Sequence, residues 1–234
     1  MPNHPVVSRQ EWLVAREVLL AKEKELTVLR DDLARQRREL PWVQVTKPYV
    51  FEGPDGQQSL SDLFAARRQL IVYHFMYAPD WTEGCPICSF WADNFERIPI
   101  HLAHRDATLV AISRAPYEKL AAYRRRMGWT FPWYSSHGSE FNYDFQVSRT
   151  REQVGSGNDE PSSRRSMALA EFPGISVFYR DEAGDVYHTY STYERGLDML
   201  NGAYHYLDLL PKGRDEAGLP WTMAWLRRRD QYED

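Results

Sequence analysis

The sequence has few cysteines, no excess of basic charge and no long apolar run. Two cysteines cannot build a disulfide scaffold, and a chain of 234 residues does not need one. Lys and Arg number 29 against 33 Asp and Glu, so the net charge is −4 and no nucleic-acid partner is expected. The longest apolar stretch, residues 70–78, is interrupted by His74 and is too short to cross a bilayer, so no membrane partner is expected either.

The composition is that of an ordinary globular protein, with 43% apolar and 26% charged residues. At about 150 residues per domain, the length fits one large domain with substantial additions. The first residues, Met-Pro-Asn-His-Pro-Val-Val, contain no basic stretch followed by an apolar one, so we expect no signal peptide and a cytoplasmic location. Thiols stay reduced there, and a close cysteine pair then indicates catalysis or metal binding rather than a structural bridge.

Residues 8–40 are predicted to form one long helix. Ser8 and Glu11 have the spacing of a capping box, and Pro41 ends the helix. Apolar side chains recur every seven residues: Trp12, Leu19, Leu26, Leu33 and Leu40. The second position of this seam is mostly polar, whereas a full coiled coil needs both positions apolar. We therefore predict an amphipathic arm, residues 1–41, that packs on its own domain or joins two chains in a homodimer.

Further along the chain, short apolar runs alternate with helical patterns. Strands are predicted at 49–52, 70–77, 107–113, 175–180 and 186–191, and helices at 59–66, 85–97, 116–127 and 192–210. The run 70–77 is apolar almost throughout, as in a central strand buried on both faces. This order predicts an α/β protein with a central mixed sheet flanked by helices. Residues 149–166 are polar and are predicted to be a mobile insertion, and residues 212–234 a C-terminal docking tail.

The sequence Cys85-Pro86-Ile87-Cys88 follows a predicted buried strand and opens a predicted helix. The first turn of a helix has free N–H groups and the positive end of the helix dipole, and both stabilise a thiolate, the reactive form of cysteine. Two intervening residues place the second sulfur one turn further on, close enough to attack a mixed disulfide. We interpret Cys85 as a nucleophile and Cys88 as a more buried resolving thiol, with Pro86 fixing the backbone.

Two other interpretations of the cysteine pair are a pair of ordinary core thiols and half of a zinc site. A zinc site needs about four ligands. The sequence contains no second CxxC, and its seven histidines show no HxxxH spacing. No metal and no cofactor are therefore predicted.

The order of strand, loop, CPxC at a helix start, strand, helix, hairpin and helix resembles the thioredoxin fold over residues 45–210. The stretch from Trp81 to Asp93 (WTEGCPICSFWAD), together with LPWV at 40–43 and VYHTYS at 186–191, is similar to a bacterial thioredoxin-like family of unassigned function. The resemblance implies a thioredoxin-like domain at 42–211. It also implies a thiol–disulfide oxidoreductase that acts on a protein or small-molecule disulfide.

The resemblance implies roles for two further residues. Thioredoxins carry a buried acid on the strand before the CxxC, and aligning Phe75 places His74 there, where it would relay the proton of Cys88. The alternative for His74 is a core histidine that hydrogen-bonds to the backbone. Thioredoxins also place a cis-proline opposite the CxxC, and Pro173 is the nearest candidate.

Peroxiredoxins share this fold and suggest an alternative function, the reduction of a peroxide by Cys85. They place a threonine three residues before the reactive cysteine, where this sequence has Thr82. They also need an arginine donor, for which Arg149 and Arg180 are candidates. A third interpretation is a non-catalytic binding or assembly module that uses the arm and the aromatic stretch 129–134 as a partner surface.

Overall fold

The computed structural model describes residues 4–150, 152–153 and 170–233. The chain divides into two compact units, Met1–Pro41 and Trp42–Asp234. Most of the insertion predicted at 149–166 lies outside the described residues. Within the described ranges, no helix combines the length and the apolar character that a membrane span requires.

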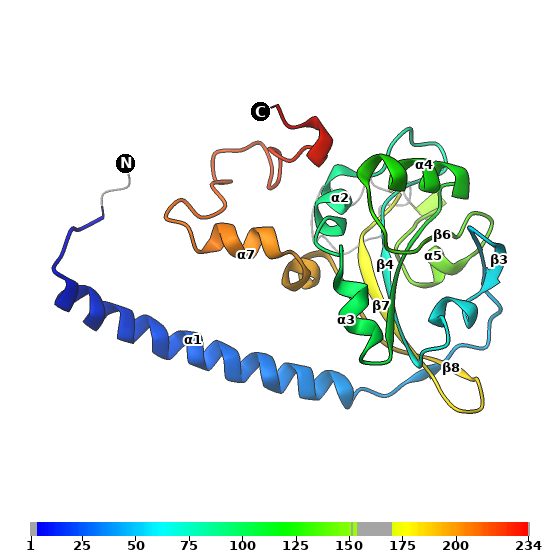
Figure 1. Ribbon diagram of the computed structural model, residues 1–234, viewed down its shortest axis with the longest axis horizontal. Coiled ribbons are helices and arrows are strands. Elements are labelled where there is room, and N and C mark those ends of the chain that lie inside the picture. The colour runs from blue at the N-terminus through cyan, green and yellow to red at the C-terminus, as the bar shows by residue number, and fades with distance from the viewer. Residues whose placement is uncertain (1–3, 151, 154–169, 234) are drawn as a thin grey trace. The chain divides into compact units, whose positions relative to one another are not determined.

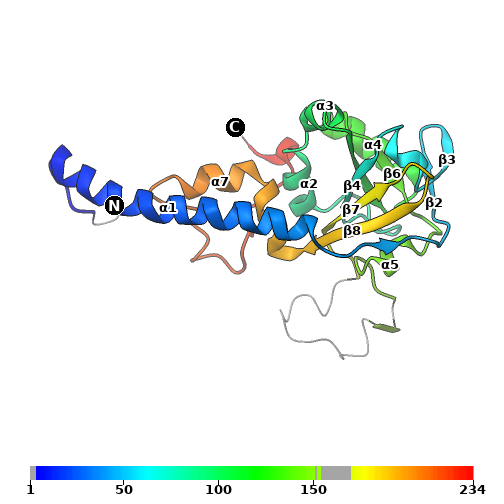
Figure 2. The same ribbon diagram turned by 90° about the horizontal axis from the view of Figure 1, so that it is seen from below.

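The first unit is a single helix, α1 (Arg9–Arg38), which Figure 2 shows as one continuous rod. The predicted capping box is present: the Ser8 backbone N–H donates to the Glu11 carboxylate at 2.9 Å, and the Glu11 N–H donates to Ser8 Oγ at 3.3 Å. No residue of α1 is buried. The predicted helix is therefore confirmed to within two residues at its end. Its large apolar side chains are exposed.

The second unit is built on one mixed sheet of eight strands in the described part of the chain (Figure 1). The strands are β1 (Val43–Gln44), β2 (Val50–Gly53), β3 (Gly56–Ser59), β4 (Gln69–His74), β5 (Ala107–Ser113), β6 (Trp133–Ser135), β7 (Gly174–Arg180) and β8 (Val186–Tyr193). Their order in the sheet is β1-β8-β7-β4-β5-β6-β2-β3. β4 pairs in parallel with β5 and β5 with β6, whereas β7 is antiparallel to both β4 and β8. The predicted α/β class with a mixed sheet and a long N-terminal helix is confirmed.

Short helices connect these strands. They are α2 (Pro86–Ala92), α3 (Ile98–Ala103), α4 (Tyr117–Met127), α5 (Phe141–Asp144) and α7 (Gly202–Asp208), with 3-10 helices at Asp62–Phe64, Glu194–Leu200 and Arg229–Gln231. The prediction for 116–127 is confirmed: Pro116 is the N-cap of α4, and Gly128 ends it with a φ of 63° that suits a glycine.

Three predicted helices differ from the structure. The helix predicted at 192–210 is divided, because β8 continues to Tyr193 and the 3-10 helix Glu194–Leu200 is separated from α7 by Asn201, the N-cap of α7. The other two are shorter than expected. The helix predicted at 85–97 ends at Ala92, because the Asn94 side chain binds the Phe90 carbonyl oxygen at 2.8 Å and Arg97 adopts a positive φ of 70°. The helix predicted at 59–66 is reduced to one 3-10 turn. Ala65 and Ala66 both have left-handed backbones there, which stop an α-helix from continuing.

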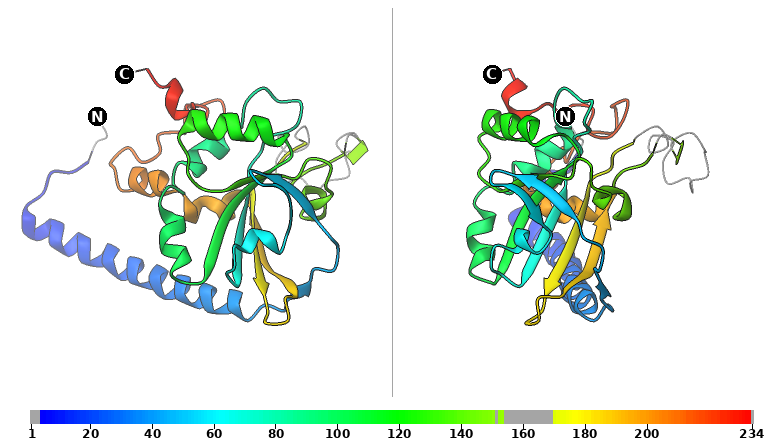
Figure 3. Two further views of the ribbon diagram at one scale, coloured as in Figure 1. Left: turned by 45° about the vertical axis from the view of Figure 1, so that its right-hand side comes forward. Right: turned by 90° about the vertical axis from the view of Figure 1, so that its right-hand side faces the viewer.

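The sheet separates two apolar cores. Figure 3 shows α3 and α4 on one side of the sheet and α5 on the other. Tyr73 and Phe75 belong to the core that contains both cysteines, whereas Leu70 and Val72 belong to the opposite one. This alternation follows from the strand geometry, in which successive side chains point to opposite faces. It decides which residues of β4 can reach the cysteine pair.

Candidate active site at the cysteine pair

Cys85 lies at the start of α2, as its N-cap residue, and Pro86 occupies the first turn. Residues 75–84 connect the carboxyl end of β4 to this point, and the Cys85 N–H donates to the Met76 carbonyl oxygen of that segment at 3.1 Å. Both cysteines are free thiols. Cys85 is 8% exposed, whereas Cys88, one turn further on, is fully buried.

The two thiols have pKa values that move in opposite directions. The pKa of Cys85 is lowered, first by the hydrogen bond that the Cys88 thiol donates and then by the backbone N–H groups of Cys88 and Ile87, against the effect of burial. The pKa of Cys88 is raised well above its usual value by burial and by the neighbouring Cys85 sulfur. Cys85 is thus the thiol that ionises first, at the site where a helix start favours an anion.

Tyr73, and not the neighbouring His74, is the residue of β4 whose side chain interacts with Cys88. The Tyr73 hydroxyl hydrogen-bonds to Cys88, and burial together with the two cysteines raises the Tyr73 pKa. The Met76 N–H also donates to Cys88 Sγ, at 3.4 Å. These two donors can stabilise a Cys88 thiolate when it forms.

The prediction of a proton-relay role for His74 is wrong. Its side chain points to the opposite face of the sheet, where Nε2 lies 2.8 Å from Ser176 Oγ and the ring packs near Phe141 and Phe145. Burial lowers the pKa of His74 to about 3, so the imidazole stays neutral near pH 7. His74 is a core histidine, and its partner is a serine rather than the backbone.

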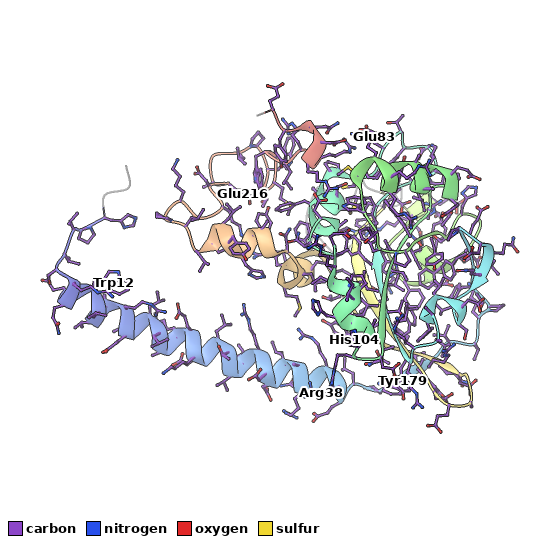
Figure 4. The ribbon with its side chains drawn as sticks, viewed as in Figure 1. Trp12, Arg38, Glu83, His104, Tyr179 and Glu216 are labelled. Carbon is purple, nitrogen blue, oxygen red and sulfur yellow. The ribbon has the colours of Figure 1, made fainter. Side chains whose placement is uncertain are left out.

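Arg228 is a residue of the site that the sequence did not reveal. It donates from Nη2 to the Gly84 carbonyl oxygen at 2.6 Å and from Nε to the Tyr123 hydroxyl at 2.9 Å. It also pairs with Glu83 at 2.8 Å. The guanidinium therefore holds the residue just before Cys85, and its positive charge contributes to the lowered Cys85 pKa. Figure 4 shows Glu83 beside the C-terminal residues that supply this contact.

A cavity of about 540 Å³ opens next to Cys85. Its walls come from the segment before α2, from the residues before β7, from the 3-10 helix Glu194–Leu200 and from the C-terminal segment. Trp81, Pro86 and Pro173 line it together with Cys85, so the structure brings these predicted site residues together. The described residues contain no cis peptide bond, so Pro173 faces the cysteine from a trans bond.

The residues assigned to a peroxidase site do not gather at Cys85. Thr82 is exposed and is absent from the cavity walls. Arg180 lies at the far end of β7, where it donates to the Arg67 carbonyl oxygen at 3.1 Å. Arg149 lies over the Phe172 ring, 4.6 Å from its centre, and does not line the cavity. In the described part of the chain, no three His, Cys, Asp or Glu side chains are grouped as metal ligands.

A comparison with protein families matches residues 1–232 to the family described as "Bacterial protein of unknown function (DUF899)". The chain belongs to this DUF899 family. The expected membership of a bacterial family without an assigned function is confirmed, and the match includes the N-terminal helix and the C-terminal segment. No curated protein matches this DUF899 chain.

Some solved structures are similar to this DUF899 protein at low sequence identity. Peroxidoxin BcpB from Mycobacterium tuberculosis is 16% identical, with 70% of this chain and 94% of that chain covered and a TM-score of 0.47. A cysteine mutant of peroxiredoxin Q from Xanthomonas campestris is 15% identical (67% and 90% covered, TM-score 0.46). A cysteine mutant of PrxQ from Xylella fastidiosa is 13% identical (69% and 89% covered, TM-score 0.43).

Proposed function

We propose that the protein is a thiol–disulfide oxidoreductase in which Cys85 is the nucleophile and Cys88 the resolving thiol. The observation that carries the proposal is the contrast between the two sulfurs. Cys85 lies at a helix start, lines a cavity and has a lowered pKa, whereas Cys88 is sealed behind it with a raised pKa. Two cysteines that only fill the core would not require a cavity beside one of them or a difference between their pKa values.

The reaction proceeds in two exchanges. The Cys85 thiolate attacks one sulfur of a substrate disulfide, forms a mixed disulfide and releases the first substrate thiolate, which takes up a proton. Cys88 then loses its proton, attacks Cys85 Sγ and releases the second substrate thiol, leaving a Cys85–Cys88 disulfide. Two electrons pass from the protein dithiol to the substrate, and an external dithiol returns them. Tyr73 and the Met76 N–H stabilise the Cys88 thiolate during the second exchange.

Peroxide is less well supported as a substrate than a disulfide. The threonine and arginines that would serve a peroxidase lie away from the cavity, and Arg228 already donates to the Gly84 carbonyl oxygen and pairs with Glu83. A reducing compartment, the cytoplasm, would keep both thiols ready to react.

We also propose that α1 joins two chains. Its apolar side chains at every seventh position remain exposed, including Trp12 at 45%, Leu26 at 46% and Leu33 at 41%. A second copy of the same helix would cover this seam.

The test uses Cys88→Ser, which keeps a hydrogen-bond donor next to Cys85 but cannot resolve a mixed disulfide. We expect this variant to form one stable mixed disulfide at Cys85 with a reagent disulfide, whereas the wild type releases both reagent thiols. Intact mass and peptide mapping distinguish the two, and Cys85→Ser is the matched control that forms no adduct. The proposal would be contradicted if Cys85 reacts with the reagent disulfide no faster than a free thiol does. It would also be contradicted if hydrogen peroxide oxidises Cys85 faster than the disulfide does.

A further inference from the structure

The cavity beside Cys85 has mostly apolar walls. Its apolar and aromatic lining residues include Tyr73, Trp81, Trp91, Phe172, Leu197 and Met223. Its volume of about 540 Å³ is in the range of cavities that enclose small organic molecules. The sulfur that reacts first therefore lies in the wall of an apolar cavity, with 8% of the residue exposed.

The arginines that line the cavity are already paired with carboxylates. Arg228 pairs with Glu83 at 2.8 Å, and Arg195 pairs with Asp198 at 3.1 Å. The buried Glu171 in the wall is itself paired with Arg114, at 2.6 Å. An anionic substrate would have to compete with these carboxylates for each guanidinium, so the paired charges disfavour an anion. The mostly apolar walls in turn favour a molecule without charge, because a charged group loses its hydration there.

The C-terminal segment builds one wall of the cavity, and the Glu216 carboxylate joins three hydrogen-bond donors there. Glu216 Oε1 accepts hydrogen bonds from the Trp225 indole at 2.7 Å, the Tyr204 hydroxyl at 2.8 Å and the Met223 N–H at 3.1 Å. Figure 4 shows Glu216 in the C-terminal segment that follows α7. Met223 is thereby held in the wall of the cavity that Cys85 also lines.

We infer that the substrate is a small, uncharged disulfide with aromatic or branched apolar substituents, which the cavity encloses while Cys85 attacks. This inference rests on the proposed function and adds the class of substrate. The two exchanges are those given above: one substrate thiol leaves when the mixed disulfide forms, and the second leaves when Cys88 closes the protein disulfide. A single turnover of the reduced protein needs no further reductant.

The test compares three disulfides in single-turnover stopped-flow experiments with the reduced full-length protein. They are 4,4′-dithiodipyridine, which is neutral at pH 8, the dianion 5,5′-dithiobis(2-nitrobenzoate), and insulin. Each rate constant is divided by that of N-acetylcysteine thiolate with the same disulfide, which removes differences in intrinsic reactivity. We expect the neutral reagent to react about tenfold faster than the dianion on this scale and to show saturation, since apolar contacts of this size give roughly that discrimination.

Met223→Asn is the variant that tests the cavity without touching the cysteines. Asparagine tolerates the positive φ of 68° at this position and removes the apolar side chain from the wall. We expect it to lose most of the preference for the neutral reagent while the pH profile of Cys85 alkylation stays unchanged. Met199→Asn is the control, because Met199 is 58% exposed and does not line the cavity, and it should behave as the wild type.

The outcomes separate the two proposals. Equal normalised rates for the neutral and dianionic reagents, or insulin as the fastest substrate, would overturn the substrate class and leave the chemistry of Cys85 standing. Unchanged selectivity in Met223→Asn would also overturn it. Failure of Cys85 to react with any of the three disulfides faster than N-acetylcysteine would instead remove the proposed function.

Discussion

Acid should destabilise the protein through His74. This residue is 1% exposed, and burial, with a smaller effect of the nearby His188, lowers its pKa from the usual 6.5 to about 3. The unfolded chain takes up a proton at this histidine below about pH 6.5, whereas the folded chain does so only near pH 3. The unfolded state therefore gains stability as the pH falls between these values.

The two pKa values set the size of the effect. At about 1.4 kcal/mol per pH unit, the free energy of unfolding should fall by about 2 kcal/mol at pH 5 and about 3 kcal/mol at pH 4 through His74 alone. The assay is urea unfolding followed by tryptophan fluorescence at pH 7.5, 5 and 4. The matched variant is His74→Gln, because glutamine can hydrogen-bond to Ser176 and cannot ionise. His188, whose pKa is also lowered, is present in both proteins and cancels in the comparison.

Parallel pH dependences of the wild type and His74→Gln would refute this reasoning. A His74 pKa near 6.5, measured by NMR titration, would refute it as well. That result would restore the sequence-based hypothesis that His74 exchanges protons near neutral pH.

Three further predictions concern the site and the arm. Tyr73→Phe should lengthen the lifetime of the mixed disulfide several-fold without changing the alkylation rate of Cys85. Acid quench followed by mass spectrometry measures both, and an unchanged lifetime would exclude a role for the hydroxyl. Arg228→Met should raise the Cys85 pKa and slow its alkylation at pH 7, whereas Arg125→Met on the exposed side of α4 should not; equal rates in both variants would show that the Arg228 charge does not act on the thiol. Deletion of residues 1–41 should convert a dimer into a monomer that keeps its thiol reactivity, as measured by light scattering, and a monomeric full-length chain would contradict the proposed arm contact.

The parts of the fold that could be predicted are those that nearby residues determine. The strand at 107–113 is buried at every position, and the helix at 116–127 has Pro116 and Gly128 at its ends. The end of α2 could not be predicted, because Asn94 joins it to a remote part of the chain by accepting from the Gly202 N–H at 2.9 Å. A sequence pattern does not show such a contact.

The site could be predicted only in part, for the same reason. The CxxC at a helix start is a local pattern, and the structure places it as expected. Arg228 reaches Gly84 from 144 residues away, in a run of arginines that resembles any charged surface. The alignment on Phe75 points to His74, one residue from Tyr73, and in a strand one residue exchanges the two faces of the sheet.

The proposed chemistry depends above all on the pKa of Cys85. It is measured as the rate of iodoacetamide alkylation of the reduced wild-type protein between pH 4 and 10, with the Cys85 peptide quantified by mass spectrometry. We expect a midpoint clearly below the value of about 8.5 for a free cysteine, with Cys88 unreactive over the same range. A midpoint at or above that value, or Cys88 reacting first, would contradict it.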